Sequence, residues 1–383
     1  MLTFLAVLTI ILTAIYGLTI LLFLTGLMFP QHGEPGATKP VTVIIAARNE
    51  QDNIGNILTD LTQQNYPRDR LQVIVVNDHS EDNTAARVQE FARQYDFIQL
   101  LDMGDIPMHF SPKKFAIQTA VENATGEIIL ATDADCRVGP KWIARMVSYF
   151  KPSVGFVIGF SQFGAKGKPQ SLIENLQTFD FVTLMGVAAG TTNLGFPMAA
   201  SGQNLAYRKQ AFLQVGGYSR VAHRVSGDDV LLMQLIRKFT EYRIVYASDK
   251  RAFAVSEPQP TLKALINQRK RWASNGAYQL RLNPLFFIYL LEVFLFNTAL
   301  LVGLPVALIT GHDMGVMLVC LSLRVLFEFA MALRSAIYFD RTDVLKFFPI
   351  WFVSQIPYIV GMGVAGTFGK FNWKERHHGA EVK

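Results

Sequence analysis

Two carboxylates, Asp133 and Asp135, stand one residue apart directly after an apolar run that ends at Ala131. Oxygen ligands at this spacing can bind one hard cation, and Mg²⁺ or Mn²⁺ takes a few carboxylates together with substrate phosphates. A cation held in this way neutralises the charge that grows on a departing diphosphate. Because the same spacing occurs in surface turns, the preceding β-rich run is what makes the pair a candidate metal site.

A second acidic pair, Asp228 and Asp229, precedes the apolar run at 230–236, which has the composition of a helix. A carboxylate at a helix start lies beside the positive end of the helix dipole, which favours the ionised form that a general base requires. Simple capping of the helix is the alternative interpretation.

Asn77 and Asp78 follow the apolar run at 71–76. An acidic side chain at a strand end can accept hydrogen bonds from a ribose hydroxyl or a nucleobase N–H. Capping of the next helix by Asp78 and Ser80 is an equally good interpretation.

The basic segment before the C-terminal apolar region contains Gln268, Arg271 and Trp272. Arginine offers a planar fork to diphosphate oxygens, and tryptophan offers a flat surface to a sugar or base. A juxtamembrane cluster that binds anionic lipid is the alternative.

Alternating strands and helices are expected to position these groups. Apolar β-rich runs alternate with helical patterns, and this order predicts βαβ units and a mostly parallel sheet. Ligands of such sheets bind at the carboxyl ends of the strands, where the acidic motifs stand. The expected strands are 41–46, 71–76, 98–101 and 127–131, and the expected helices are 54–63, 83–94 and 114–123.

Composition places part of the chain in a membrane, since half of its 383 residues are apolar and only 17% are charged. Residues 2–28 are long enough to span a bilayer and lack the features of a signal peptide, so we expect an uncleaved anchor. Three further apolar stretches lie near 285–309, 314–338 and 345–369. The expected domains are an anchor at 1–30, a catalytic domain at 31–281, membrane helices at 282–369 and a basic tail at 370–383.

Basic residues around the junction of the last two stretches, Arg334, Arg341 and Lys346, place that junction in the cytosol by the positive-inside rule. Pro349 and Pro357 make the last stretch a candidate for a broken or re-entrant segment, so the side of the tail is left open. We expect an integral protein of a bacterial inner membrane with a cytosolic catalytic domain.

Other classes of function are excluded by composition. The net charge is +6, but the basic residues are not interleaved with aromatic ones, which argues against nucleic-acid binding. Cys136 and Cys320 lie far apart without a CxxC partner, so they predict neither a zinc site nor a disulfide framework. A reducing compartment fits this cysteine usage.

Taken together and in this order, the motifs resemble the membrane-bound family 2 glycosyltransferases, which include cellulose, chitin and hyaluronan synthases and ceramide glucosyltransferase. The resemblance extends to the Ala-Arg-Asn-Glu sequence at 47–50, to Lys113-Lys114 and to the Ser-Gly-Gln-Asn sequence at 201–204. It covers almost the whole chain. It implies an α/β catalytic domain of the GT-A fold, with transmembrane helices at both ends.

The resemblance also implies roles for individual residues. Asp78 matches the acid that contacts the nucleotide, and Asp133 and Asp135 match the pair that holds the donor diphosphate through Mg²⁺ or Mn²⁺. Asp229 matches the catalytic base, with Asp228 as the alternative. The remaining matches are expected to bind substrate: Ala47, Arg48, Glu50, Asn77, Lys114, Gln203, Asn204, Gln268, Arg271 and Trp272. The chain departs from the family at Asn77, where an acid is frequent, and at Gly-Asp-Asp (227–229), where Glu-Asp or Thr-Glu-Asp is frequent.

The expected function is inverting transfer of a sugar from a nucleotide sugar, with UDP as the expected nucleotide, to a lipid or short glycan acceptor. Donor, acceptor and membrane lipids are therefore the expected partners. A processive polysaccharide synthase is the first alternative, although the few C-terminal membrane segments leave little protein for a polymer channel. A non-catalytic membrane scaffold or export partner is the second.

Glu292, Arg324 and Glu328 lie in C-terminal stretches that are otherwise mostly apolar. A charge at bilayer depth costs roughly 2.5–3.5 kcal/mol on insertion scales. Arg324 and Glu328 are four residues apart, so they can pair on one helical face. The alternative is that all three line a groove for an acceptor head group.

Overall fold

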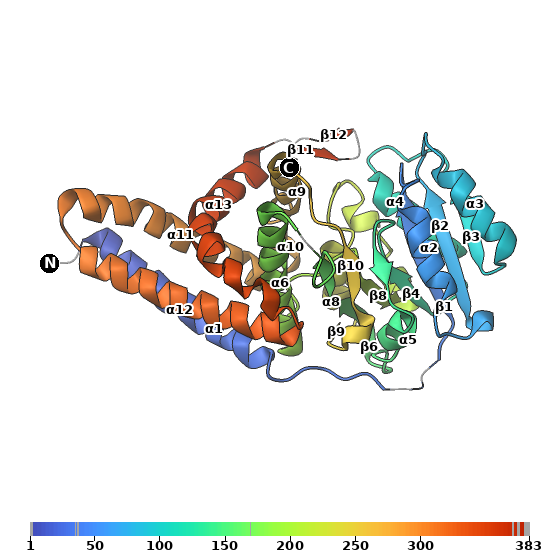
Figure 1. Ribbon diagram of the computed structural model, residues 1–383, viewed down its shortest axis with the longest axis horizontal. Coiled ribbons are helices and arrows are strands. Elements are labelled where there is room, and N and C mark those ends of the chain that lie inside the picture. Colours follow the sequence, from blue (N-terminus) through green and yellow to red (C-terminus); the bar gives the residue numbers. More distant parts are fainter. Residues whose placement is uncertain are drawn as a thin grey trace. The chain divides into compact units, whose positions relative to one another are not determined.

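The computed structural model describes residues 3–34, 36, 38–168, 170–369, 371–373 and 376–378. The chain forms two compact units (Figure 1). The first, called here the helical unit, comprises Met1–Phe29, Pro169–Leu194 and Gln259–Lys383. The second, called the sheet unit, comprises Pro30–Lys168 and Gly195–Pro258.

A seven-stranded sheet forms the centre of the sheet unit, in the order β3-β2-β1-β4-β8-β6-β9. The first four strands in this order are parallel, β8 is antiparallel to both of its neighbours, and β9 is parallel to β6. The predicted mostly parallel sheet is therefore confirmed. The strands are β1 (Val41–Ala47), β2 (Leu71–Asn77), β3 (Ile98–Asp102), β4 (Ile128–Ala131), β6 (Val154–Gly159), β8 (Leu205–Arg208) and β9 (Arg243–Ala247).

Helices cover the sheet. The apolar composition of the strands matches this arrangement, because most strand residues are buried. The register places Val43 beside Val73 and Leu130, and these residues share a core with Ile57 of α2 and with Trp142 of α5. A small second sheet joins β5 (Arg137–Val138), β10 (Ala254–Ser256) and β7 (Ser161–Phe163). The helices of this unit are α2 (Ile54–Thr62), α3 (Thr84–Gln94), α4 (Pro112–Asn123), α5 (Trp142–Val147), α7 (Lys209–Gln214) and α8 (Val230–Phe239).

Among the described residues of the helical unit, four segments are long and apolar enough to cross a membrane. They are α1 (Phe4–Gly26), α11 (Pro284–Thr310), α12 (Met314–Tyr338) and the segment Thr342–Phe368, which contains α13 (Phe348–Phe368). The expected anchor and the three expected C-terminal stretches are thus helical. Helix α13 continues through Pro357, so the helix is not broken there.

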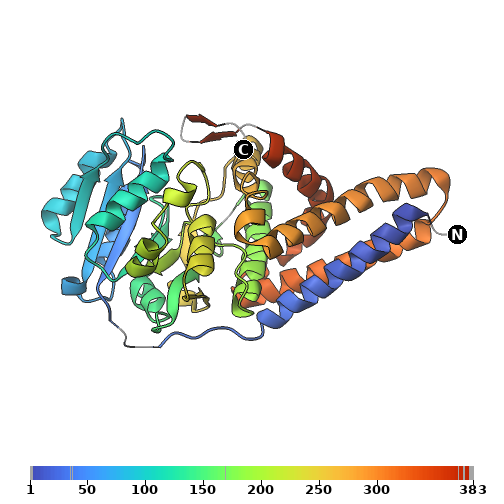
Figure 2. The same cartoon turned by 180° about the vertical axis from the view of Figure 1, so that it is seen from behind.

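Helix α1 packs along α12 and α11, and both views of the molecule show α1 and α12 side by side (Figures 1 and 2). The unit also contains α6 (Leu172–Asn193), α9 (Leu262–Ala273) and α10 (Gln279–Leu282). The segments carrying α6 and α9 fall inside the expected catalytic domain at 31–281, yet they group with the apolar helices. The expected extent of the catalytic domain, residues 31–281, remains a prediction. Most of the basic tail lies outside the described residues.

The charged residues of the apolar helices have local partners. Arg324 is completely buried, and its Nε lies 2.9 Å from Glu328 Oε1. The Tyr16 hydroxyl donates to the same oxygen at 3.0 Å, and Thr19 donates to Glu292 at 3.3 Å. The predicted pairing of Arg324 with Glu328 is present, whereas a groove role for Glu292 remains a prediction.

Candidate active site

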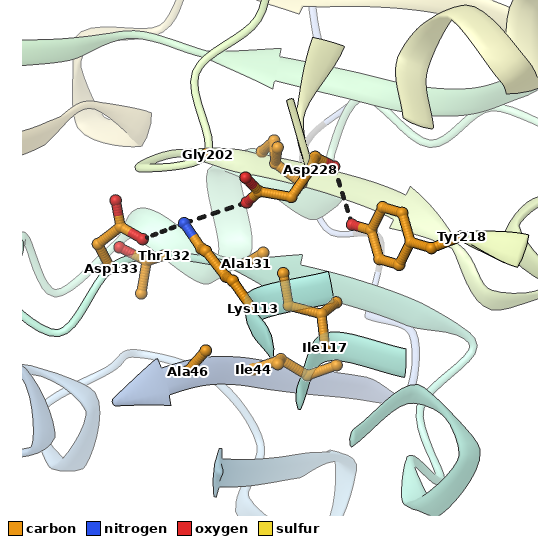
Figure 3. Close-up of a pocket in the computed structure, with 11 residues that line it drawn as sticks. Ile44, Ala46, Lys113, Ile117, Ala131, Thr132, Asp133, Gly202, Tyr218 and Asp228 are labelled. Atoms are coloured by element: carbon orange, nitrogen blue, oxygen red, sulfur yellow. Dashed lines mark hydrogen bonds and ion pairs between the residues drawn. The ribbon is translucent and has the colours of Figure 1, made fainter. Parts of the chain in front are cut away.

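Polar side chains gather where β4 ends and α4 and α8 begin. Asp133 follows β4, Lys113 lies in the first turn of α4, and Asp228 immediately precedes the α8 cap. The Lys113 Nζ lies 2.8 Å from Asp133 Oδ1 and 3.0 Å from Asp228 Oδ2, so one ammonium bridges two carboxylates (Figure 3). The pocket around them is lined by Ile44, Ala46, Lys113, Ile117, Ala131, Thr132, Asp133, Gly202, Leu205, Tyr218 and Asp228.

Charge and burial act against each other at this bridge. Burial opposes the charged form of Lys113, but attraction to Asp133 and Asp228 outweighs it and raises the pKa of Lys113 above its ordinary value. Burial likewise opposes ionisation of Asp228, but attraction to Lys113 holds the pKa of Asp228 below its ordinary value. Both partners are therefore ionised at neutral pH, and Asp228 is a poor proton acceptor.

Asp229 has a different environment from its neighbour. Its Oδ1 accepts a hydrogen bond from Val230 N at 2.6 Å, and its Oδ2 accepts one from Gly202 N at 2.9 Å. Asp229, rather than Asp228, is therefore the N-cap of α8. Burial, reinforced by the charge of Asp228, raises the pKa of Asp229 to about 6. Capping and proton transfer are compatible, because this pKa suits a group that exchanges a proton near neutral pH.

Glycine at position 202 keeps the backbone close to both acids. A Cβ added there would lie 3.2 Å from Asp228 Oδ2. Tyr218 supports the same segment, because its hydroxyl donates to the Asp228 carbonyl at 2.8 Å. The loop around Gly202 and the Asp228 backbone are thus held from two sides.

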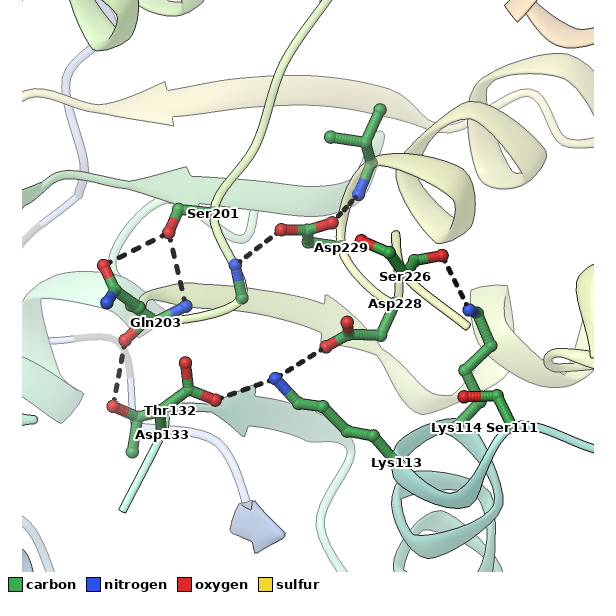
Figure 4. A network of polar contacts seen from close by, with 12 residues as sticks. Ser111, Lys113, Lys114, Thr132, Asp133, Ser201, Gln203, Ser226, Asp228 and Asp229 are labelled. Carbon is green, nitrogen blue, oxygen red and sulfur yellow. Dashed lines mark hydrogen bonds and ion pairs between the residues drawn. The ribbon is translucent and has the colours of Figure 1, made fainter. Parts of the chain in front are cut away.

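The two lysines at the start of α4 have different surroundings. Lys114, expected to bind substrate, is completely buried and donates to the Ser226 carbonyl at 2.8 Å (Figure 4). It also donates to the Arg224 carbonyl. Burial lowers the pKa of Lys114 to about 7. Lys113 is the one that lines the pocket. Adjacent helical residues lie about 100° apart, so only one of the two could face the site, and the sequence does not indicate which.

Gln203 and Asn204, also expected to bind substrate, differ in burial: Gln203 is half-buried, whereas Asn204 is buried. The Gln203 carbonyl accepts from Thr132 Oγ1 at 2.9 Å, which ties this loop to the end of β4. Asn204 is completely buried. Its amide nitrogen donates to the carbonyls of Phe160 and Ala252, both at 2.8 Å, and its oxygen accepts from Trp142 Nε1 at 2.9 Å. These contacts describe a residue that joins three segments of the core.

The loops after β1 and β2 form a second polar group. Asp78 is largely buried, and its backbone N–H donates to the Ala47 carbonyl at 2.8 Å. Arg48 Nη1 donates to the Asp78 carbonyl at 3.3 Å, and the His79 ring lies 3.2 Å from Asp78 Oδ1. Thus Ala47, Arg48 and Asp78 lie together, as expected for neighbouring parallel strands.

Two further residues of these loops make mainly structural contacts. Asn77 donates to Asp102 Oδ1 at 2.8 Å, and its own side-chain oxygen accepts from Ser80 N at 3.1 Å. Glu50 N donates to Thr84 Oγ1 at 2.8 Å. Their contribution to nucleotide binding remains a prediction.

The donor set of the Asp-x-Asp motif fits a hard cation. Asp133 and Asp135 are both partly exposed, and both are carboxylates. Within the part of the chain that the structure describes, no group of three or more His, Cys, Asp or Glu residues could hold a metal ion. Two carboxylates with substrate phosphates as the remaining ligands is a usual arrangement for Mg²⁺. The metal assignment stays a prediction.

Gln268, Arg271 and Trp272 are part of α9, in the helical unit. The neighbouring Arg269 is buried and pairs with Asp180 of α6 at 2.8 Å, and its guanidinium lies 4.3 Å from the Trp272 ring centre. Because α9 and the Asp-x-Asp motif belong to different units, the expected place of this motif beside the donor diphosphate remains a prediction.

Asp180 of α6 joins two other helices of that unit, α9 and α13. Besides Arg269 of α9, it accepts hydrogen bonds from Trp351 Nε1 at 3.1 Å and from Gln355 Nε2 at 3.3 Å, both on α13. No sequence motif indicated this residue. Its only signal was an acidic side chain in an otherwise mostly apolar helix.

Comparison with known proteins identifies the family. Residues 4–375 match the family model of glycosyl transferase family 21. The chain belongs to this family. The expectations of a glycosyltransferase and of the GT-A fold are thereby confirmed. The mannosyltransferase PcManGT from Pyrobaculum calidifontis, in complex with GDP-Man and Mn²⁺, superposes with a TM-score of 0.64 at 20% identity, over 94% of this chain and 98% of that one.

The curated relatives of this family 21 chain match it over only part of their length. It is 27% identical over 246 residues to the probable glycosyltransferase YdaM of Bacillus subtilis (strain 168), covering 62% of this chain and 55% of that protein. It is 26% identical over 239 residues to the poly-beta-1,6-N-acetyl-D-glucosamine synthase of Staphylococcus epidermidis, covering 62% and 54%. The chain thus spans about half the length of these relatives.

Proposed function

We propose that this protein is an inverting, metal-dependent glycosyltransferase that moves a sugar from a nucleotide sugar to a lipid or short glycan acceptor at a membrane. The observation that carries the proposal is the grouping of Lys113, Asp133 and Asp228 in one pocket, with Asp229 at the adjoining helix start. Cationic and acidic groups at the carboxyl ends of parallel strands are suited to a nucleotide diphosphate and its leaving charge.

Asp229 is the proposed base. It takes the proton of the acceptor hydroxyl, whose oxygen forms a bond to the anomeric carbon as the bond from that carbon to the donor diphosphate breaks. The raised pKa of Asp229 favours this role over Asp228, which is held ionised by Lys113. A single displacement of this kind inverts the anomeric centre, and the nucleoside diphosphate leaves with the electron pair.

Asp133 and Asp135 are the residues proposed to hold Mg²⁺ or Mn²⁺, and Asp78 and Arg48 are proposed to contact the nucleotide. When bound, the cation would neutralise charge on the departing diphosphate. Lys113 adds a fixed positive charge next to Asp133. The Mn²⁺ present with PcManGT supports the choice of metal.

Four helices that could cross a membrane support an acceptor that is itself lipid-linked. We further propose that the chain is an integral membrane protein of a bacterial inner membrane, with the sheet unit in the cytosol. Similarity to the Staphylococcus epidermidis poly-beta-1,6-N-acetyl-D-glucosamine synthase favours a second candidate function, processive synthesis of a polysaccharide.

One experiment tests the proposal and separates the two candidates. Purified protein in detergent is incubated with UDP- or GDP-sugars, with Mn²⁺ or with EDTA, and with a total lipid extract. We expect Mn²⁺-dependent donor cleavage and lipid products carrying a single added sugar by mass spectrometry. A ladder of long glycans would favour the processive candidate, and the absence of any donor cleavage would contradict both.

A further inference from the structure

The Lys113 ammonium has an unusual position for a residue beside a proposed metal site. It lies 2.8 Å from Asp133 Oδ1, an oxygen of the Asp-x-Asp motif itself, and 3.0 Å from Asp228 Oδ2. The side chain of Lys113 is 19% exposed, that of Asp228 is 11% exposed and that of Asp133 is 31% exposed, so water screens the contact with Asp228 less than the contact with Asp133. A divalent cation that approaches Asp133 is therefore repelled by the Lys113 ammonium, which already contacts Asp133 Oδ1, one of the oxygens that would bind the cation.

The groups around Lys113 restrict where it can move. Asp228 is fixed through its backbone by Tyr218, and Gly202 lies close to its carboxylate. Lys113 can release Asp133 and keep Asp228, but the net charge near the cation is then still raised by its ammonium. A diphosphate in the pocket changes this balance, because its oxygens offer Lys113 another anionic partner and offer the cation further ligands.

We propose that Lys113 acts as an internal counter-ion that makes divalent-cation binding at Asp133 depend on the donor nucleotide. This inference rests on the proposed function, since it takes the donor to be a nucleotide diphosphate. In consequence the cation and the nucleotide bind cooperatively, and each raises the affinity for the other by the same factor. Lys113 is then a residue that sets the order of assembly of the site.

The test measures binding, so it does not depend on turnover. Mn²⁺ binding to the full-length protein in detergent is measured by electron paramagnetic resonance without nucleotide. The affinity for UDP is then measured with and without saturating Mn²⁺. The variants are Lys113→Met, which removes the charge, and Lys113→Arg, which keeps it. Lys141→Met removes the charge of an exposed lysine of the same unit and is the matched control.

We expect Lys113→Met to bind Mn²⁺ without nucleotide about tenfold or more tightly than the wild type, with a correspondingly smaller gain in UDP affinity on adding Mn²⁺. Lys113→Arg and Lys141→Met should resemble the wild type. Lys113→Gln provides the same comparison if the methionine variant does not fold, because glutamine retains a hydrogen-bond donor without the charge.

An unchanged or weaker Mn²⁺ affinity in the folded uncharged variants overturns the inference. If the wild type binds UDP and Mn²⁺ together in that case, the proposed function stands and only the role of Lys113 is wrong. If neither the wild type nor any variant binds Mn²⁺, with or without UDP, the metal assignment fails together with this inference.

Discussion

Replacing Asn204 by alanine distinguishes a structural residue from a substrate contact. The family resemblance implies that Asn204 binds substrate, but the structure buries it completely between Phe160, Ala252 and Trp142. Gly159 makes room for it, since a Cβ there would lie 2.4–2.5 Å from atoms of the Asn204 amide. The fit of this amide into the core is therefore close on every side.

The cost of Asn204→Ala can be worked from these contacts. The Ala252 carbonyl and the Trp142 indole N–H lose their hydrogen-bond partner, whereas the Phe160 carbonyl keeps the bond from Ala254 N. A buried polar group without a partner costs roughly 1–3 kcal/mol, so even at the lower limit the two losses amount to about 2 kcal/mol. For a unit of the size of the sheet unit, a loss of about 1 kcal/mol lowers Tm by roughly 2–4 °C, and we therefore expect a fall in Tm of roughly 4 °C or more.

Thermal unfolding of the purified protein, followed at one heating rate, measures this effect, and UDP binding is measured on the fraction that remains folded. Gln203→Ala is the matched control, because Gln203 is the neighbouring amide and is only half-buried. It should change Tm much less. The reasoning would be refuted by an Asn204→Ala protein with wild-type Tm and lost UDP affinity, which would make Asn204 a donor contact.

Three further changes test separate parts of the site and fold. If Asp229 is the base, turnover should fall as the pH drops through about 6, because burial raises the pKa of Asp229 and protonation removes the base. A rate constant that stays level down to pH 4.5 would instead favour Asp228, whose pKa is lowered. Asp135→Asn should abolish Mn²⁺-dependent donor cleavage at unchanged Tm, and full activity would remove Asp135 from the metal site. Gly126→Ala should lower stability by roughly 1–3 kcal/mol, seen as a lower Tm, because the new Cβ would lie 2.4 Å from the backbone nitrogen of Thr42. A wild-type Tm would show that the strand can shift.

The sequence predicted the elements that depend on local composition. The run at 41–46 became a strand because both of its faces are buried, and such strands are apolar throughout. Asp78 and the pair Asp133 and Asp135 were found because they follow strands directly, and the acidic pair at 228–229 was found because it precedes an apolar helix. The antiparallel placement of β8 between β4 and β6 was not predicted, since it depends on long-range pairing.

Side-chain direction was the other limit. Lys113 and Lys114 have the same chemistry and adjacent positions, and only the packing of α4 against the segment at 222–226 decides which one is buried. Asn204 could not be separated from Gln203 for the same reason. The grouping of α6 with the apolar helices was also missed, because its contacts with α1 and α12 connect distant parts of the chain.

The contacts of Asp180 have a consequence for how the protein responds to its lipid surroundings. A bilayer of different thickness changes the tilt of a helix that spans it. If α13 spans the membrane, as proposed, we expect its tilt to reach α9, which carries Gln268 and Arg271, because Asp180 joins Trp351 and Gln355 of α13 to Arg269. Acyl-chain length is then expected to be a variable of enzyme activity. Rates in vesicles of graded chain length should vary for the wild type and vary less for Asp180→Asn, and an identical dependence in both would show that the membrane acts by another route.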